Sequence, residues 1–124
     1  MTKLFKLIDK NFSKVDNEWQ WTYSCLFPFT FNKYPITEIT ITDHLWKKKG
    51  REEVTKELIL SILRERLNNK IAKPSKYRGK RIVFIRQIIL YARKNYRLIF
   101  WFKDQTTNHL WIRNCYPINY EEKP

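Results

Sequence analysis

Hydrophobic and polar positions recur with two different periods along this chain, and the change of period separates predicted helices from predicted strands. Near the start, apolar residues fall at helical spacing, at Leu4, Phe5, Leu7 and Ile8. This spacing predicts a short amphipathic helix over residues 2–12. Residues 19–27 instead alternate and are rich in aromatic and β-branched side chains, which predicts a strand that stops at Pro28. Another short extended segment is expected over residues 36–41.

The clearest helical pattern lies in the middle of the chain. Thr55 is placed to cap its first turn, because a threonine oxygen accepts a hydrogen bond from the unpaired amides there. One apolar face follows, made of Leu58, Ile59, Ile62, Leu63 and Leu67. Asn68, Asn69 and Pro74 are expected to end the helix. Just before it, a shorter helix is predicted to begin at Thr42 or Asp43 and to end at Gly50.

From residue 80 onward the period falls to two. Strands are predicted over residues 81–86, with a continuation to Tyr91 left open, and over 96–103 and 109–118. Residues 104–108 form the turn between the last two. Because sequential strands are usually antiparallel neighbours, we expect an α+β fold. Its antiparallel β-sheet would be a meander of about four strands, with two or three helices preceding it and packed on one face.

Composition indicates a single domain over residues 1–124. The chain is 43% hydrophobic and 16% aromatic, which is enough for one core and too little for two at this length. We expect an N-terminal helix and strand extension over about residues 1–37, and the main core over about residues 38–118.

Charge points to a polyanionic partner. The formal net charge is +13, and residues 47–103 hold eighteen Lys and Arg against four Glu, whereas the rest is close to neutral. A basic region of this kind is typical of proteins that bind nucleic acid and release its counterions. An acidic protein partner is the alternative interpretation, and the two are compatible.

Other classes of protein are disfavoured by what the sequence lacks. Apolar runs such as residues 98–102 are far shorter than a membrane span, and the N-terminus has no signal-peptide core, so neither a membrane partner nor export is expected. Cys25 and Cys115 stand far apart, which favours buried thiols in a reducing cytoplasm. Gly50 and Gly79 are the only glycines, so a phosphate-cradling glycine loop is not expected.

The candidate chemistry is cleavage of RNA without a metal. Carboxylates are few and scattered, so no metal site and no cofactor are expected. RNA carries its own nucleophile, the 2′-hydroxyl, and its cleavage needs a base, an acid and a cation. The two histidines, His44 and His109, are candidates for acid and base, and Arg86 and Arg113 for the cation. The simpler alternative is that each histidine is a surface or hydrogen-bonded structural residue.

Further basic and aromatic residues are candidates for contacts with nucleic acid. Along the predicted strand 96–103, Arg97, Ile99, Trp101 and Lys103 share one face, and apolar residues fill the other. A guanidinium binds phosphate and a tryptophan stacks on bases. The remaining phosphate candidates are Arg81, Lys47 and Lys48. A solvated sheet face with Trp101 covering the core is the alternative.

Two stretches carry a resemblance to a known family. Residues 39–45, a strand leading to His44, and residues 110–118, a final strand with a Tyr-Pro pair, are similar to segments of the small BECR-type toxin ribonucleases. This family includes RelE/ParE-like toxins and the nuclease domains of some colicins and contact-dependent toxins. The resemblance implies a nuclease-like core over about residues 38–118. It also implies roles for His44 as acid or base, for Arg113 and Asn114 as phosphate contacts, and for Tyr116 as a supporting donor.

The sequence therefore predicts a cytoplasmic, toxin-like endoribonuclease that cleaves RNA through 2′-hydroxyl attack. Its expected partners are tRNA or mRNA, free or on the ribosome, and an acidic antitoxin or immunity protein. The alternative is a non-catalytic nucleic-acid-binding or inhibitory protein, such as a phage or mobile-element accessory factor. A third possibility is a protein-interaction domain whose charge serves an acidic partner.

Overall fold

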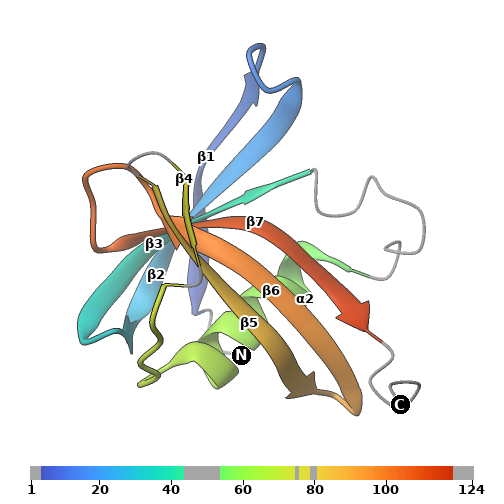
Figure 1. The fold of residues 1–124 in the computed structure, drawn as a ribbon. Coiled ribbons are helices and arrows are strands. Elements are labelled where there is room, and N and C mark those ends of the chain that lie inside the picture. Colours follow the sequence, from blue (N-terminus) through green and yellow to red (C-terminus); the bar gives the residue numbers. More distant parts are fainter. Residues whose placement is uncertain (1–3, 44–53, 75, 79–80, 119–124) are drawn as a thin grey trace.

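The computed structural model describes residues 4–43, 54–74, 76–78 and 81–118, and these form one sheet with one helical segment. Seven strands lie in the order β1-β2-β3-β7-β6-β5-β4 (Figure 1). Their bounds are β1 (Phe5–Ser13), β2 (Glu18–Phe31), β3 (Tyr34–Thr42), β4 (Lys76–Arg78), β5 (Arg81–Tyr91), β6 (Lys94–Phe102) and β7 (His109–Ile118).

The sheet is built from two antiparallel meanders joined by one parallel pair. Strands β1, β2 and β3 form the first meander, and β4 to β7 form the second. The helical segment crosses between them, so β3 and β7 run parallel, with Glu38 opposite His109 and Ile41 opposite Ile112. The expected α+β fold with two or three helices before a four-stranded meander is therefore wrong. The described residues are mostly β, and their helix follows three strands.

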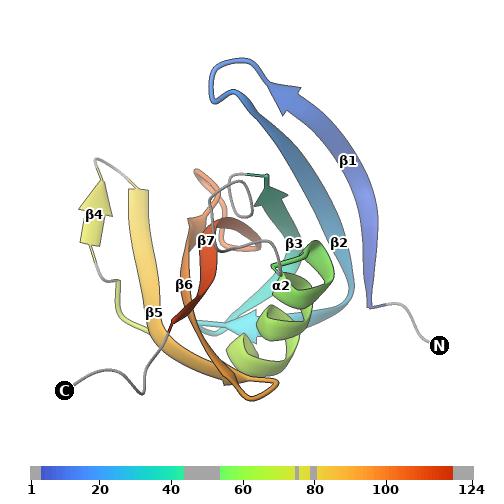
Figure 2. The same cartoon turned by 90° about the vertical axis from the view of Figure 1, so that its right-hand side faces the viewer.

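The helical segment consists of α2 (Lys56–Ile62) and a π-helical continuation, η1 (Leu63–Leu67). Thr55 caps it as predicted, since its side-chain oxygen accepts a hydrogen bond from the Leu58 amide at 3.1 Å. The predicted end at Asn68 is confirmed as well. Figure 2 shows the sheet curling around this helix, which lies in its concave face.

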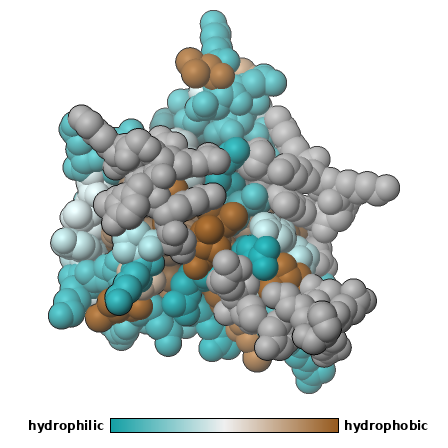
Figure 3. All heavy atoms as spheres, viewed as in Figure 1, coloured by the Kyte–Doolittle hydropathy of each residue, from teal (hydrophilic) through white to brown (hydrophobic). Residues whose placement is uncertain are grey.

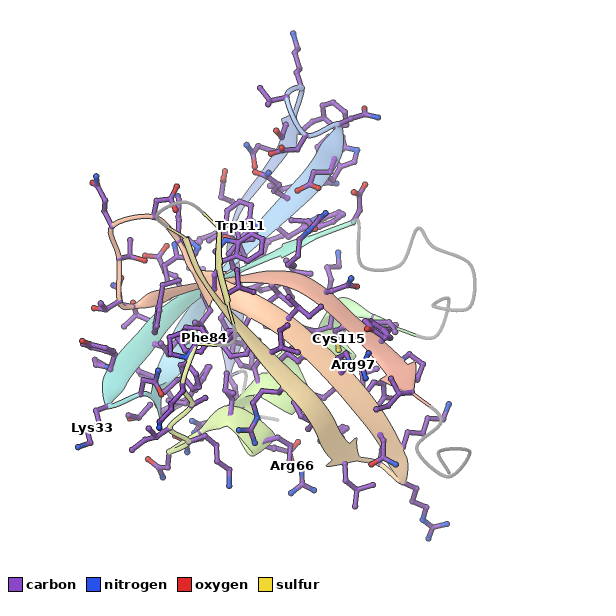
Figure 4. All side chains as sticks on the ribbon, viewed as in Figure 1. Lys33, Arg66, Phe84, Arg97, Trp111 and Cys115 are labelled. Atoms are coloured by element: carbon purple, nitrogen blue, oxygen red, sulfur yellow. The ribbon has the colours of Figure 1, made fainter. Side chains whose placement is uncertain are left out.

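The core fills the space between the helix and the curled sheet. The apolar face of the helix packs there with alternate residues of β2, β3, β6 and β7. At one end, Phe31, Phe84 and Phe100 form an aromatic group, in which Phe31 lies 5.2 Å from each of the other two rings, edge to face. Such pairs add to the free energy gained from buried area. Figure 4 labels Phe84 in this group.

The N-terminal helix predicted over residues 2–12 is wrong, because residues 5–13 form the edge strand β1. Two of the apolar residues at helical spacing lie at the protein surface, Leu7 47% and Ile8 49% exposed, whereas Phe5 packs against the core. A β-bulge between Leu7 and Asp9 disturbs the alternation that would have indicated a strand. Pairing with β2 therefore overrides the local pattern.

The other strand predictions differ mainly in their limits. Strand β2 continues past Pro28 to Phe31, because a bulge between Ser24 and Phe29 accommodates the proline. The segment over 36–41 is confirmed as β3, and the last strand is confirmed over residues 109–118. Strand β5 does reach Tyr91. No helix among the residues that the structure describes is long and apolar enough to cross a membrane.

Candidate functional site

The face of the sheet turned away from α2, here called the outer face, carries an unusual concentration of buried polar groups. Alternation along β2 and β3 turns Thr22 and Thr40 to this face, while Ile39 and Ile41 enter the core. The buried polar residues of the described chain are Glu18, Thr40, Thr42, Asp43 and His109. We call the outer-face row from Glu18 to His109 the polar strip.

One end of the polar strip is a hydrogen-bonded chain around His109. Its Nε2 lies 2.6 Å from the Oγ1 of Thr40, and that oxygen lies 2.8 Å from the Oγ1 of Thr22. Its Nδ1 lies 3.9 Å from a carboxylate oxygen of Glu38. Burial lowers the pKa of His109, opposed by the charge of Glu38 and reinforced by that of Lys103.

The order carboxylate, imidazole, hydroxyl is that of a nucleophilic triad, yet the geometry indicates a structural role. Thr40 is 1% exposed, so its hydroxyl has no access to a substrate. His109 is 7% exposed and both ring nitrogens face protein groups. A neutral His109 that satisfies Thr40 is the expected state near pH 7, and this matches the structural alternative considered for it.

The other end of the strip is a carboxyl group within range of the charge of an arginine. Glu18, at the start of β2, is 9% exposed, and Gln20 Nε2 donates to its Oε2 over a long 3.4 Å. Burial raises the pKa of Glu18; the hydrogen bond from Gln20 lowers it, Asp16 raises it, the charge of Arg113 lowers it, and Asp43 raises it. A carboxyl group adjusted in this way is suited to proton transfer nearer neutral pH.

Backbone geometry explains why these groups meet. A bulge in β7, between Asn114 and Ile112 opposite β6, inserts Arg113 as an extra residue and so redirects its side chain. Asp43, just past the end of β3, donates its amide to the carbonyl of Trp19 at 3.1 Å, which fixes it beside the start of β2. Glu18 at the start of β2, Asp43 just after β3 and Arg113 at the bulge within β7 thereby come from three segments that are distant in sequence.

His44 follows Asp43 directly, but it lies outside the described residues, as do Lys47 and Lys48. Along β3, Asp43 is five residues from Glu38, the strand partner of His109. At about 3.3 Å per residue this separation is roughly 16 Å. The two ends of the polar strip are therefore distinct groups, with Asp43 in the Glu18 group.

The predicted arginines fall on two faces of the sheet. Arg86 is opposite Leu98, and Leu98 is a core residue, so Arg86 points to the side of the helix. Arg97 and Tyr116 are opposite one another on the outer face, where the guanidinium donates to the tyrosine hydroxyl at 3.2 Å. Figure 4 shows Arg97 towards the end of β7, well away from Trp111. Arg86 thus lies on the opposite face of the sheet from Arg97 and from Glu18.

The remaining candidates differ in accessibility. Trp101 is paired with Trp111 on the outer face but is 7% exposed, which leaves little ring surface for a base. Asn114 is half-buried beside Arg113 in the β7 bulge. Arg81 begins β5, and its side chain is outside the described part of the structure. Figure 3 shows this face as hydrophilic around an apolar centre.

Sequence reasoning missed Glu18, Thr40 and Glu38 as members of the polar strip. Alternation within residues 18–24 put Glu18 on the same face as Gln20 and Thr22, which was a usable signal. The contact of these residues with β7 could not be predicted from the sequence. It depends on the parallel pairing of β3 with β7, which are about seventy residues apart in the chain. Cys25 and Cys115 are free and buried, as expected, and burial raises the pKa of Cys25 to about 12.

Among the described residues, no three His, Cys, Asp or Glu side chains gather in a geometry suited to a metal ion. In comparisons with known proteins, no family model, no curated protein and no solved structure matches this chain.

Proposed function

We propose that this protein is a metal-independent endoribonuclease whose catalytic groups lie at the Glu18 end of the polar strip. The observation that carries the proposal is the burial of the Glu18 side chain, 9% exposed, whose carboxyl accepts a 3.4 Å hydrogen bond from Gln20 and feels the positive charge of Arg113. A general base and a cation are two of the groups that cleavage at an RNA phosphate requires. The net charge of +13 supports RNA as the substrate.

In the proposed reaction, Glu18 accepts the proton of a ribose 2′-hydroxyl, whose oxygen attacks the adjacent phosphorus. The bond from phosphorus to the 5′-oxygen of the next nucleotide breaks, and an acid protonates that oxygen. The products are a 2′,3′-cyclic phosphate and a free 5′-hydroxyl. Arg113 stabilises the charge on the phosphorane oxygens, and His44, next to Asp43 in the chain, is the proposed acid.

Glu18 is a better candidate than His109, although both are largely buried. The carboxyl group of Glu18 is held by one long hydrogen bond from Gln20, and both Gln20 and Arg113 are only half-buried. A phosphate could therefore replace these contacts without dismantling the sheet. The proposal keeps the toxin-like class, with an acidic antitoxin or immunity protein as the expected protein partner.

A non-catalytic nucleic-acid-binding protein is the second candidate. The observation that favours it is the commitment of His109 to Thr40 and Glu38, together with the position of Arg86 on the helix side of the sheet, across from Glu18. A binding protein would use the same positive charge and would leave RNA intact.

The test is incubation of the purified protein with mixed tRNA and mRNA in EDTA, with and without ribosomes, followed by analysis of the product ends. Glu18→Gln and His44→Ala are each expected to slow cleavage on the order of 10²-fold while leaving RNA affinity nearly unchanged. Glu38→Gln is the matched control, because Glu38 is a half-buried carboxylate on the same face. Its cleavage rate should equal that of the parent.

The outcomes separate the two candidates. Equal cleavage by the parent and Glu18→Gln would remove Glu18 from the mechanism. Intact RNA under every condition, with tight and salt-sensitive binding, would favour the non-catalytic protein.

A further inference from the structure

The hairpin of β1 and β2 projects from the body of the sheet (Figure 1). It carries a group of exposed aromatic rings. Phe12 and Trp19 are strand partners, 42% and 41% exposed. Their ring centroids lie 5.4 Å apart in an edge-to-face arrangement. Neither ring belongs to the core, so their exposure has no evident role in stabilising the fold.

Two lysines from different elements complete this group. The Nζ of Lys10, on β1, lies 4.9 Å from the ring centroid of Trp19 and 6.0 Å from that of Trp21. The Nζ of Lys56, the first residue of α2, lies 4.3 Å from the centroid of Trp21. We call Lys10, Phe12, Trp19, Trp21 and Lys56 the aromatic platform.

The aromatic platform is separate from the polar strip. Because neighbouring residues on a strand point to opposite faces, Trp19 and Trp21 face the side of α2, whereas Glu18 and Gln20 face the outer side. Position along β2 nevertheless brings the two sites to the same strand end. Asp43 of the proposed catalytic group is hydrogen-bonded to the carbonyl of Trp19.

We propose that the aromatic platform binds single-stranded nucleic acid. Bases stack on Trp19 and Phe12, and the ammonium groups of Lys10 and Lys56 pair with the flanking phosphates. Surfaces that bind single strands combine these two elements, since every base has a stacking face and every linkage carries a negative charge. Charge complementarity selects this occupant, because one ammonium group lies 4.9 Å from the ring of Trp19 and a second lies 4.3 Å from the neighbouring ring of Trp21.

The surroundings suggest where such a strand lies. The negative charge of Glu57 acts on Tyr23, two residues beyond Trp21 on β2, and contributes to its raised pKa after burial. Asp9 is opposite Thr22, on the other face of the hairpin of β1 and β2. We therefore place the stacked bases over Trp19 and Phe12, towards the tip of the hairpin, so that only the end of the strand at Lys56 lies near Glu57. This inference goes beyond the proposed function, because binding here requires no cleavage.

The test is the affinity of the full chain for a fluorescently labelled 2′-O-methyl RNA dodecamer, measured by anisotropy. This RNA lacks the free hydroxyl that the proposed cleavage uses. Trp19→Ala and Phe12→Ala are each expected to weaken binding by about 5- to 100-fold, the loss of one stacked base. Phe27→Ala is the matched control, since Phe27 is 51% exposed on the same strand, and it should bind within twofold of the parent.

Lysine variants test the phosphate contacts. Lys10→Ala should weaken binding and reduce the slope of log affinity against log salt by about one, whereas the exposed Lys33→Ala, on the turn between β2 and β3, should reduce it less. A Trp19→Ala/Phe12→Ala variant that binds like the parent would overturn the proposal. So would displacement by duplex RNA, polyglutamate or anionic vesicles at concentrations as low as those of single-stranded RNA.

The two proposals fail independently. Loss of dodecamer binding in Trp19→Ala, with no cleavage by any form of the protein, would support the aromatic platform and contradict the nuclease. Cleavage that depends on Glu18, with no effect of replacing Trp19 or Phe12 on affinity, would support the nuclease and contradict the aromatic platform.

Discussion

At the scale of single residues, the buried carboxyl of Glu18 lowers the stability of the fold in its charged form, and the same group is the proposed catalytic base. Its carboxyl is buried, and the charged form lacks the solvation it has in the unfolded chain. Residues held in an unfavourable state of this kind are often retained for function. The structure thus distinguishes Glu18 from His109, whose neutral ring is satisfied by Thr40.

Replacing Glu18 by Gln should remove this unfavourable charge without changing the shape of the side chain. The folded pKa of Glu18 lies above its ordinary value of 4.5. Its contribution to stability is thus present below pH 4.5 and is lost as the pH rises through the folded pKa. We expect the free energy of unfolding of Glu18→Gln, relative to the parent, to increase from pH 4 to pH 7. Urea unfolding at both pH values measures it, and a constant difference would show that burial does not affect Glu18.

His109 should produce the opposite pH dependence. Its folded pKa lies below the ordinary value of 6.5, so its contribution is complete above pH 6.5 and is lost as the pH falls towards the folded pKa. The parent and His44→Ala should therefore lose stability between pH 7 and pH 5, to a greater extent than His109→Gln. Chemical unfolding across this range measures the slope, and equal slopes for all three proteins would contradict the buried, neutral His109.

At the scale of elements, sequence reasoning succeeded where local chemistry decides and failed where pairing decides. The cap at Thr55 and the strand over residues 109–118 could be predicted from a side-chain oxygen and from alternation. Strand β1 could not, because its apolar residues face solvent and its bulge breaks the period. The pairing of Glu18 with Arg113 could not be predicted from the sequence either. The two residues come near each other only because of the bulge in β7 and the order of the strands.

The turn between β5 and β6 shows the same limit in detail. Ala92 and Arg93 both have positive φ, 49° and 68°, in a two-residue hairpin that favours Asn and Gly. Neither residue is a turn signal, so the sequence alone does not indicate where β5 ends. Left-handed backbone costs roughly 1 kcal/mol at a residue with a Cβ atom.

Arg93→Gly should therefore raise the free energy of unfolding by roughly 1 kcal/mol, because glycine adopts positive φ without this cost. The matched control is Lys94→Gly, one residue later in the regular strand β6, which should lower stability instead. Thermal unfolding of the two variants compares them directly. A decrease for Arg93→Gly similar to that for Lys94→Gly would contradict the strained turn.

At the scale of the whole molecule, the curled sheet encloses the helix and leaves two sites at one end of β2. Its outer face carries the Glu18 group of the polar strip, and its other face carries the aromatic platform. The net charge of +13 would attract RNA to both the Glu18 group and the aromatic platform. A single-stranded RNA held on the aromatic platform would thus lie across β2 from the proposed catalytic carboxyl, at the same strand end, where the backbones of Asp43 and Trp19 are hydrogen-bonded.

The most direct measurement compares one single-stranded RNA with its 2′-O-methyl counterpart, each incubated with the parent protein in EDTA. We expect the RNA to be cut to fragments ending in 2′,3′-cyclic phosphate and the methylated strand to be bound but not cut. Cleavage of both strands, or of neither with and without ribosomes, would contradict a nuclease that uses the 2′-hydroxyl.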